Sequence, residues 1–224
     1  MLTDAAAGAL AGLFERLSRL RGKRIFHPFG AGFAATLEPV GAALPFVREP
    51  VEAKVRLSRA LGLPEWLPDP CGLALRVPDA SGPGRHQDLL LVSSALAPVA
   101  RHLPLPSRHF LDRPYSTLLP YRLDGELLLL AARGRVSGGE AVNLADLRRR
   151  EAGGLDFELL VASLGGEWRP VARLALGKRL PVEETERLDF DPTNTGGGLE
   201  LAGLINHLRG PSYRGSQDGR ASSR

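Results

Sequence analysis

The sequence has little cysteine, little lysine and no long apolar run. Cys71 is the single cysteine among 224 residues, which excludes a disulfide framework and a thiolate metal cluster. A lone thiol is typical of a reducing compartment, so we expect a cytoplasmic location. No stretch approaches the roughly 20 apolar residues that a membrane-spanning helix needs. Glu15 and Arg16 interrupt the Ala/Leu-rich start, which is therefore not typical of a signal peptide. We expect no membrane partner.

The basic residues are almost all arginines, and the formal net charge is +4. A guanidinium group binds carboxylates and phosphates through a planar fork, so this composition suits an anionic ligand or no particular ligand. Apart from Arg148–Arg150 the arginines are dispersed, and no nucleic-acid-binding motif accompanies them. We therefore do not expect a nucleic-acid partner.

A hydrophobic content of 43% in a chain of this length is enough for one sizeable core. We expect a single domain over residues 1–224, with a helical arm at 1–22 and a C-terminal helix or tail at 199–224. The arm has apolar residues at helical spacing, and residues 199–208 repeat that spacing. Residues 142–150 are compatible with a short helix or a loop.

The remaining chain is typical of short strands separated by Gly, Pro and charged turns. Residues 98–120 lack a clean period, and we expect loops with short helices there. The expected strands are Phe33–Leu37, Ala53–Leu57, Gly72–Val77, Asp88–Val92, Glu126–Ala132, Leu155–Ser163 and Arg169–Leu176. Antiparallel strands of this number remove exposed edges by closing on themselves. The sequence therefore predicts an α+β protein: a closed antiparallel β-barrel of about eight strands with N- and C-terminal helices.

Two short motifs carry the most information about function. The first is Arg24-Ile-Phe-His-Pro-Phe-Gly-Ala-Gly-Phe33, and the second is Arg209-Gly-Pro-Ser-Tyr213 with Arg220 beyond it. Between them lie Lys54–Ser58, Asp69–Ala74, Gln87–Ser94, Leu174–Lys178 and Phe190–Asn194. In this order and spacing the motifs resemble the haem catalase family over roughly residues 20–220. The long wrapping segments of that family are short or absent here, so the chain resembles a minimal catalase-like, peroxidase-like haem protein.

The resemblance implies haem b as the cofactor, bound to iron through Tyr213 on the proximal side. Arg209 falls four residues before Tyr213, at the family's spacing. Arg24, Arg56 and Arg220 match arginines that pair with the haem propionates, and charge-assisted bidentate bonds suit that role. Gly210-Pro211 interrupts the expected proximal helix, because proline breaks helical hydrogen bonding.

On the opposite face His27 matches the distal histidine, which moves a proton between the two peroxide oxygens. Gly30 and Gly32 would let the backbone approach the porphyrin. Ser93 stands where the family has its distal asparagine, and Phe26 is larger than the valine usual beside the histidine. A regular strand places residues three apart on opposite faces, so Arg24 and His27 can share a pocket only through a twist or bulge near Gly30.

These features predict a haem protein that reduces hydrogen peroxide or organic hydroperoxides with an external electron donor and has weak catalase activity. The missing asparagine leaves an alternative open, a non-enzymatic haem-binding or haem-sensing protein on a degenerate catalase barrel. The oligomeric state and the physiological substrate are not predicted.

Overall fold

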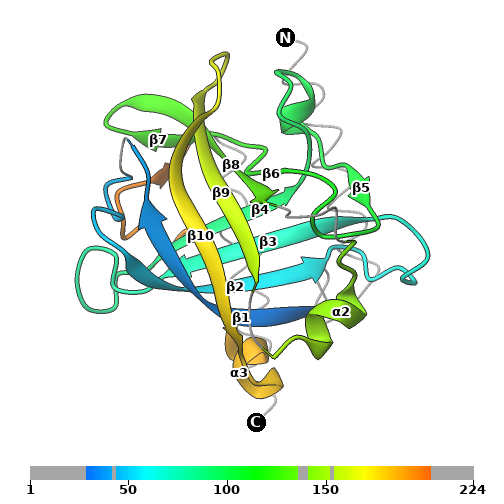
Figure 1. The fold of residues 1–224 in the computed structure, drawn as a ribbon. Coiled ribbons are helices and arrows are strands. Elements are labelled where there is room, and N and C mark those ends of the chain that lie inside the picture. Colours follow the sequence, from blue (N-terminus) through cyan, green and yellow to red (C-terminus); the bar gives the residue numbers. More distant parts are fainter. Residues whose placement is uncertain (1–28, 42–43, 136–140, 152–153, 203–224) are drawn as a thin grey trace, which may run out of the picture.

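The computed structural model describes residues 29–41, 44–135, 141–151 and 154–202. Within these ranges eight antiparallel strands form a closed barrel (Figure 1). They are β1 (Phe29–Pro39), β2 (Val51–Arg59), β3 (Asp69–Val77), β4 (Gln87–Ser93), β6 (Tyr115–Ser116), β8 (Glu126–Arg135), β9 (Leu155–Ser163) and β10 (Arg169–Arg179). The order around the barrel is β8-β6-β4-β3-β2-β1-β10-β9, and β9 pairs back with β8. The predicted barrel is confirmed.

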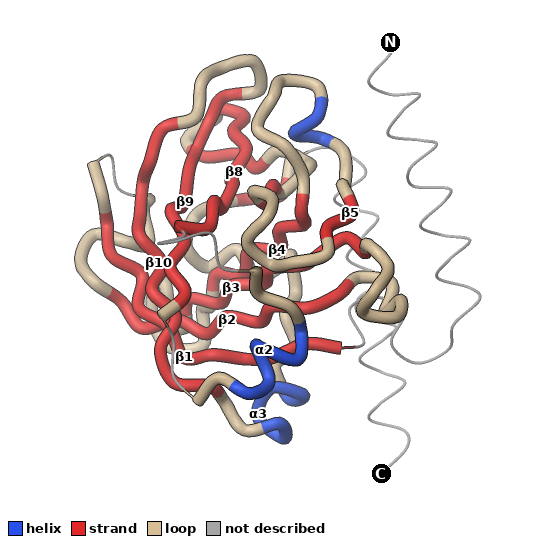
Figure 2. The backbone as a smooth tube through the Cα atoms, turned by 45° about the vertical axis from the view of Figure 1, so that its right-hand side comes forward, coloured by secondary structure: helices blue, strands red, loops and turns tan. Residues whose placement is uncertain are grey.

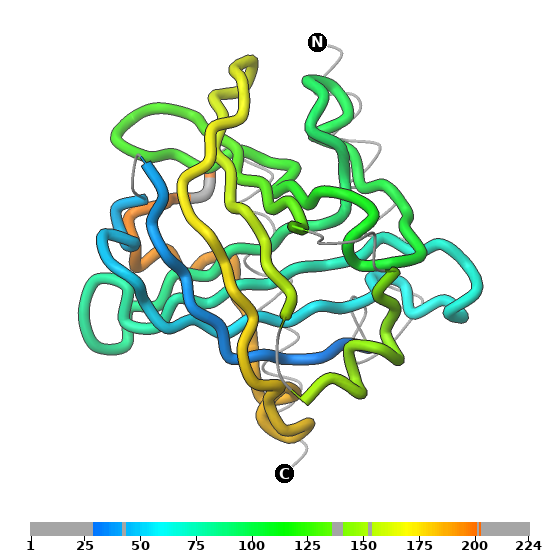
Figure 3. Tube along the Cα trace, in the orientation of Figure 1, coloured from blue at the N-terminus to red at the C-terminus, as the bar shows by residue number. Residues whose placement is uncertain are grey.

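Closure brings together segments that are far apart in the sequence. Strand β1, blue in Figure 3, lies beside β10, yellow, and the two are antiparallel from Phe33 opposite Arg179 to Pro39 opposite Ala172. The β1–β2 pairing runs without interruption from Phe29 to Leu37. The irregularity in β1 lies between Phe33 and Ala35 on the β10 side, and not at Gly30.

Three short strands lie outside the barrel circuit. β5 (Pro106–Ser107) pairs with the start of β3, β7 (Tyr121–Leu123) forms a hairpin with β8, and β11 (Glu200–Leu201) pairs with β7. The β7–β8 turn is Asp124-Gly125, and both residues have the positive φ that a tight two-residue hairpin requires. The helix predicted from residue 199 is wrong at its start, because Glu200–Leu201 is extended; residues 203–208 lie outside the described ranges.

The inside of the barrel is filled by apolar side chains that alternate along each strand. Val55 and Leu57 on β2 point inward, while Lys54 and Arg56, which alternate with them, do not. Phe157 packs edge-on against Tyr115, with ring centroids 6.0 Å apart, across the centre of the barrel. The period-2 pattern read from the sequence is therefore the pattern of the core.

Two short helices lie at one end of the barrel, near β1 (Figure 2). α2 (Leu144–Arg149) starts at a capping box in which Asn143 Oδ1 accepts from the Asp146 N–H and Asp146 Oδ2 accepts from the Asn143 N–H. α3 (Val182–Arg187) follows β10 and contacts β1. The helices predicted near the two termini fall on residues 1–22 and 203–224, outside the described ranges. No helix in the described part of the chain is long and apolar enough to span a membrane.

Candidate functional site

The outer surface of strands β1 to β4, opposite the core side, gathers several residues of the sequence motifs. Its side chains stand in rows set by the strand register: Gly30, Ser58, Gly72 and Val92 in one row, and Gly32, Arg56, Ala74 and Leu90 in the next. We call this surface the outer face of β1–β4. Four of these eight positions are glycine or alanine, so the face is flat.

Arg56 lies on this outer face and crosses over Gly30. A Cβ atom at Gly30 would stand 2.6 Å from the Leu57 carbonyl oxygen and 3.0 Å from Arg56 Cζ. Glycine at position 30 is thus what allows the Arg56 guanidinium to lie along the strand. Arg56 is half-buried, and Ser58 beside it is only 3% exposed, so this end of the face is largely shielded from solvent.

The other end of the face is covered by α3. A Cβ atom at Gly32 would stand 2.5 Å from Thr185 Oγ1, and Thr185 is itself 7% exposed. An ion pair of 2.9 Å between Lys54 Nζ and Glu184 Oε1 holds the helix against β2. The space above Gly32 is therefore occupied by the Thr185 side chain. The expectation that the backbone at Gly32 approaches a porphyrin is not met in this structure.

Ser93 lies on the core side of β4, away from Arg56. It shares the orientation of Leu89 and Leu91 and is 1% exposed. Its Oγ accepts from the Cys71 N–H at 2.9 Å and donates to the Leu105 carbonyl at 2.6 Å. A serine hydroxyl has one proton to donate, and here Leu105 receives it. The structure does not bring Ser93 together with Arg56.

On β4, Leu90 and Val92 face the same side as Arg56, and Val92 is the neighbour of Ser93 that the sequence comparison missed. Val92 pairs with Gly72, and Gly72 pairs with Ser58. The alternation of Leu89 and Leu91 as core residues was the signal that could have placed Val92 outside and Ser93 inside. The outer face therefore presents the aliphatic side chain of Val92 where the serine hydroxyl of Ser93 was expected.

A buried carboxylate fixes the loop that leads toward the C-terminal segment. Asp88, at the start of β4, is 0% exposed and pairs with both Nε and Nη2 of Arg76 at 2.7 and 2.5 Å. The same carboxylate accepts from the Asp191 N–H at 2.8 Å and from Asn194 Nδ2 at 3.0 Å. Arg76 also lies over the Phe190 ring, 5.4 Å from its centroid. The Phe190–Asn194 motif is thus bonded to the barrel through Asp88 and Arg76.

Six of the eight predicted site residues lie outside the described residues: Arg24, Phe26, His27, Arg209, Tyr213 and Arg220. Among the described residues no group of three or more His, Cys, Asp or Glu side chains could hold a metal ion. Burial raises the pKa of the Cys71 thiol to about 12, which makes it a poor nucleophile and metal ligand at neutral pH.

Comparison with known proteins gives a structural match. No protein-family model matches the sequence, and no curated protein matches it either. Among solved structures the chain is similar to catalase A from Saccharomyces cerevisiae, with a TM-score of 0.62 and 12% sequence identity. The match covers 92% of this chain and 63% of that catalase chain. The fold is thus catalase-like, and the chain spans less than two thirds of its neighbour's length.

Proposed function

We propose that this chain binds one haem b against the outer face of β1–β4 and uses it to reduce peroxides with an external electron donor. The observation that carries the proposal is the position of Arg56. In a catalase-like barrel, the arginine expected to pair with a haem propionate lies beside Gly30 on a flat, largely shielded face.

The described residues suit a haem at one end of this face. The row of Gly30, Ser58, Gly72 and Val92 is small or aliphatic, as a planar porphyrin requires, and Arg56 in the next row supplies a cation for a propionate. At the other end Thr185 occupies the space above Gly32. The described core side chains fill the barrel interior, which favours the Gly30 end of the outer face for the cofactor.

Haem bound there would supply the iron chemistry that cleaves the peroxide oxygen–oxygen bond. Arg56 would hold a propionate and so fix the cofactor's rotation. His27 would move the peroxide proton, and Tyr213 would provide the anionic oxygen that holds ferric iron, with Arg209 stabilising the tyrosinate. Arg24 and Arg220 would pair with the propionates, and Phe26 would pack at the porphyrin. Val92 excludes water but donates no hydrogen bond, so catalase turnover should be weak compared with peroxidase turnover.

A second candidate function is haem binding or sensing without turnover. It is favoured by the geometry of Ser93, whose hydroxyl proton is committed to Leu105 on the core side of β4. A face with no amide donor beside Arg56 can hold a porphyrin without assisting peroxide cleavage. Measured peroxidase activity of the haem-loaded protein separates the two functions.

The first experiment is the absorption spectrum of the purified protein after addition of haem b. We expect a Soret band and one haem per chain. Tyr213→Phe removes the ligand oxygen and keeps the ring, so the ferric spectrum should change and the haem content should fall. An unchanged spectrum in this variant would show that Tyr213 is not the ligand.

The second experiment tests Arg56 by substitution with glutamine. Loss of one charge-assisted bond to a propionate should weaken haem binding about tenfold, measured by titration of the Soret band. Arg122→Gln is the matched control, because Arg122 is exposed and, within the described part of the chain, its side chain donates to the Gly125 carbonyl in the β7–β8 hairpin. Equal haem affinity in both variants would place the cofactor elsewhere.

A further inference from the structure

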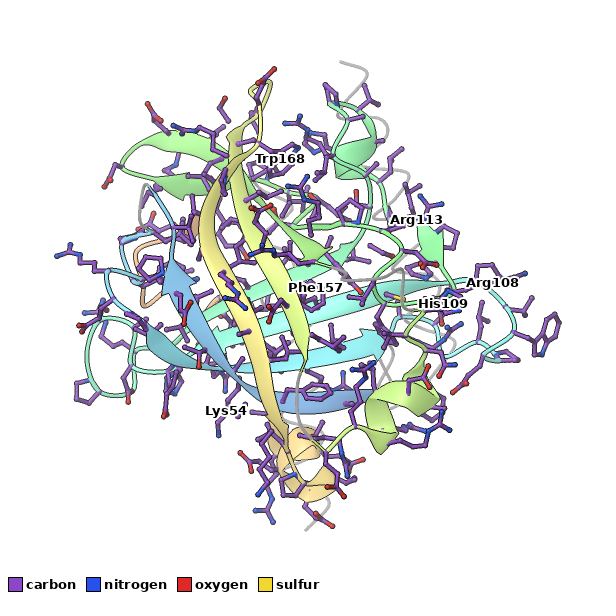
Figure 4. The ribbon with its side chains drawn as sticks, in the orientation of Figure 1. Lys54, Arg108, His109, Arg113, Phe157 and Trp168 are labelled. Carbon is purple, nitrogen blue, oxygen red and sulfur yellow. The ribbon has the colours of Figure 1, made fainter. Side chains whose placement is uncertain are left out.

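A polar hollow of about 380 Å³ lies at the edge of the barrel, where β5 pairs with the start of β3. The hollow is lined by Pro68, Pro106, Ser107, Arg108, Asp112 and Arg113. Figure 4 shows Arg108, His109 and Arg113 together on the side of the molecule that carries β5. None of these residues belongs to the outer face of β1–β4, so the hollow is separate from the proposed haem site.

Two guanidinium groups line the hollow, and little negative charge balances them. Arg108 is exposed and has no hydrogen-bond or ion-pair partner among the described residues. Arg113 donates its Nε–H to the Pro106 carbonyl at 3.0 Å, which leaves its two terminal nitrogens to a ligand. Like charges close together raise the energy of the unliganded state, and a bound anion relieves that repulsion.

The one acidic side chain in the lining, Asp112, already contacts His109. Asp112 Oδ2 lies 3.0 Å from His109 Nδ1, so this carboxylate is directed toward the histidine. The lining then has two arginines against one paired carboxylate. A net positive site of this kind selects an anion that carries more than one charge over chloride.

The walls of the hollow are held in place by the barrel. Pro106 and Ser107 are paired with Pro70 and Asp69, and the Ser107 hydroxyl donates to the His109 carbonyl at 2.8 Å. On the other wall, Arg59 Nη2 donates to the Leu67 carbonyl at 2.6 Å, immediately before Pro68. Because the Nε–H bond fixes the Arg113 fork on this rigid frame, little side-chain entropy remains to be lost on binding.

We propose that this hollow is a binding site for a doubly charged oxyanion, a phosphate group that is either free or part of a small ester. A tetrahedral phosphate accepts bidentate bonds from two guanidinium forks at once, which a monovalent halide cannot do. This site is independent of haem, and its test does not depend on the proposed function.

The test is calorimetric titration of the full-length protein with inorganic phosphate at constant ionic strength, set with sodium chloride so that general screening is unchanged. We expect saturable binding, weakened about tenfold by Arg108→Gln and by Arg113→Gln, since each loses charge-assisted bonds. Arg122→Gln is again the control and should bind as the parent does. Unfolding midpoints without phosphate show whether each variant is folded.

Titration with glycerol phosphate then distinguishes the two sources of the ligand. Equal or tighter binding than inorganic phosphate identifies an ester, and weaker binding identifies the free ion; both results support the site. Absence of saturable binding of inorganic phosphate, or equal binding by both arginine variants and the parent, would overturn the proposal.

Discussion

At the scale of single residues, two small side chains decide how neighbouring elements fit. Gly32 lets Thr185 of α3 rest against β1, and Ser93 joins the Cys71 N–H of β3 to the Leu105 carbonyl. The resemblance to catalases implies that both residues face a cofactor. In the structure both contribute contacts that hold the barrel together.

We expect Ser93→Ala to lower the free energy of unfolding by about 2–4 kcal/mol, because the buried Cys71 N–H and the part-buried Leu105 carbonyl each lose a partner. Urea unfolding measures this loss. Ser94→Ala is the control, since Ser94 Oγ has one close bond, 2.9 Å to the Ala100 carbonyl, and its removal should cost less. Equal stability of the Ser93 variant and the parent would contradict the structural role.

We expect Gly32→Ala to destabilise the protein by about 1–3 kcal/mol, because the added methyl group overlaps Thr185 Oγ1. In a Thr185→Ala background the same substitution should cost less, since the overlapping atoms are gone. A double-mutant cycle measured by urea unfolding gives this coupling. Strictly additive effects would mean that the two residues do not meet in solution.

At the scale of elements, the loop from Phe190 to Asn194 is bonded to β4 through Asp88. The Asp88 carboxylate receives bonds from Arg76, from the Asp191 N–H and from Asn194. Gln87 adds two more contacts, to the Asn194 carbonyl and from the Gly197 N–H. The start of β4 therefore acts as the anchor for the loop that precedes the C-terminal segment.

Asp88→Asn should destabilise the protein by about 3 kcal/mol or more, because it leaves the Arg76 guanidinium, 17% exposed, without its counter-charge. The loop should also become sensitive to limited proteolysis between residues 190 and 198. Asp124→Asn removes a carboxylate from the exposed β7–β8 turn and should change neither property. A resistant loop in the Asp88 variant would show that other contacts hold it.

At the scale of the whole molecule, closure of the barrel buries the side chains of Cys71 and Tyr115. Burial raises the pKa of Cys71 from 9.0 to about 12 and raises the pKa of Tyr115 well above its usual 10.0. Both side chains belong to the core, and both stay protonated while the barrel is closed. In the unfolded chain each ionises at its ordinary pKa.

The stability of the protein should therefore fall as the pH rises above 9. Between pH 9 and 12 the unfolded chain loses the Cys71 proton and the folded protein keeps it, so unfolding becomes more favourable by up to about 1.4 kcal/mol per pH unit. Urea unfolding at a series of pH values measures this slope. Cys71→Ala should flatten it between pH 9 and 10, before Tyr115 contributes. An identical slope in that variant would assign the effect to other groups.

The sequence by itself determined seven of the eight barrel strands and the resemblance to a catalase-like barrel; the eighth strand, β6, lies in residues 98–120, where loops and short helices were expected. These depend on local information: the alternation of Val55 and Leu57, the Gly, Pro and charged turns, and the order of the short motifs. The alternation of core residues along β4 also indicated that Ser93 faces the core. Comparison with the catalase motif instead assigned the outward position to Ser93, one residue after Val92. The tertiary structure alone decided that Thr185 covers Gly32, that Asp88 bonds to Asn194 and that β9 pairs back with β8. Such contacts join residues far apart in the chain, and they form only when closure of the barrel fixes the register of all its strands.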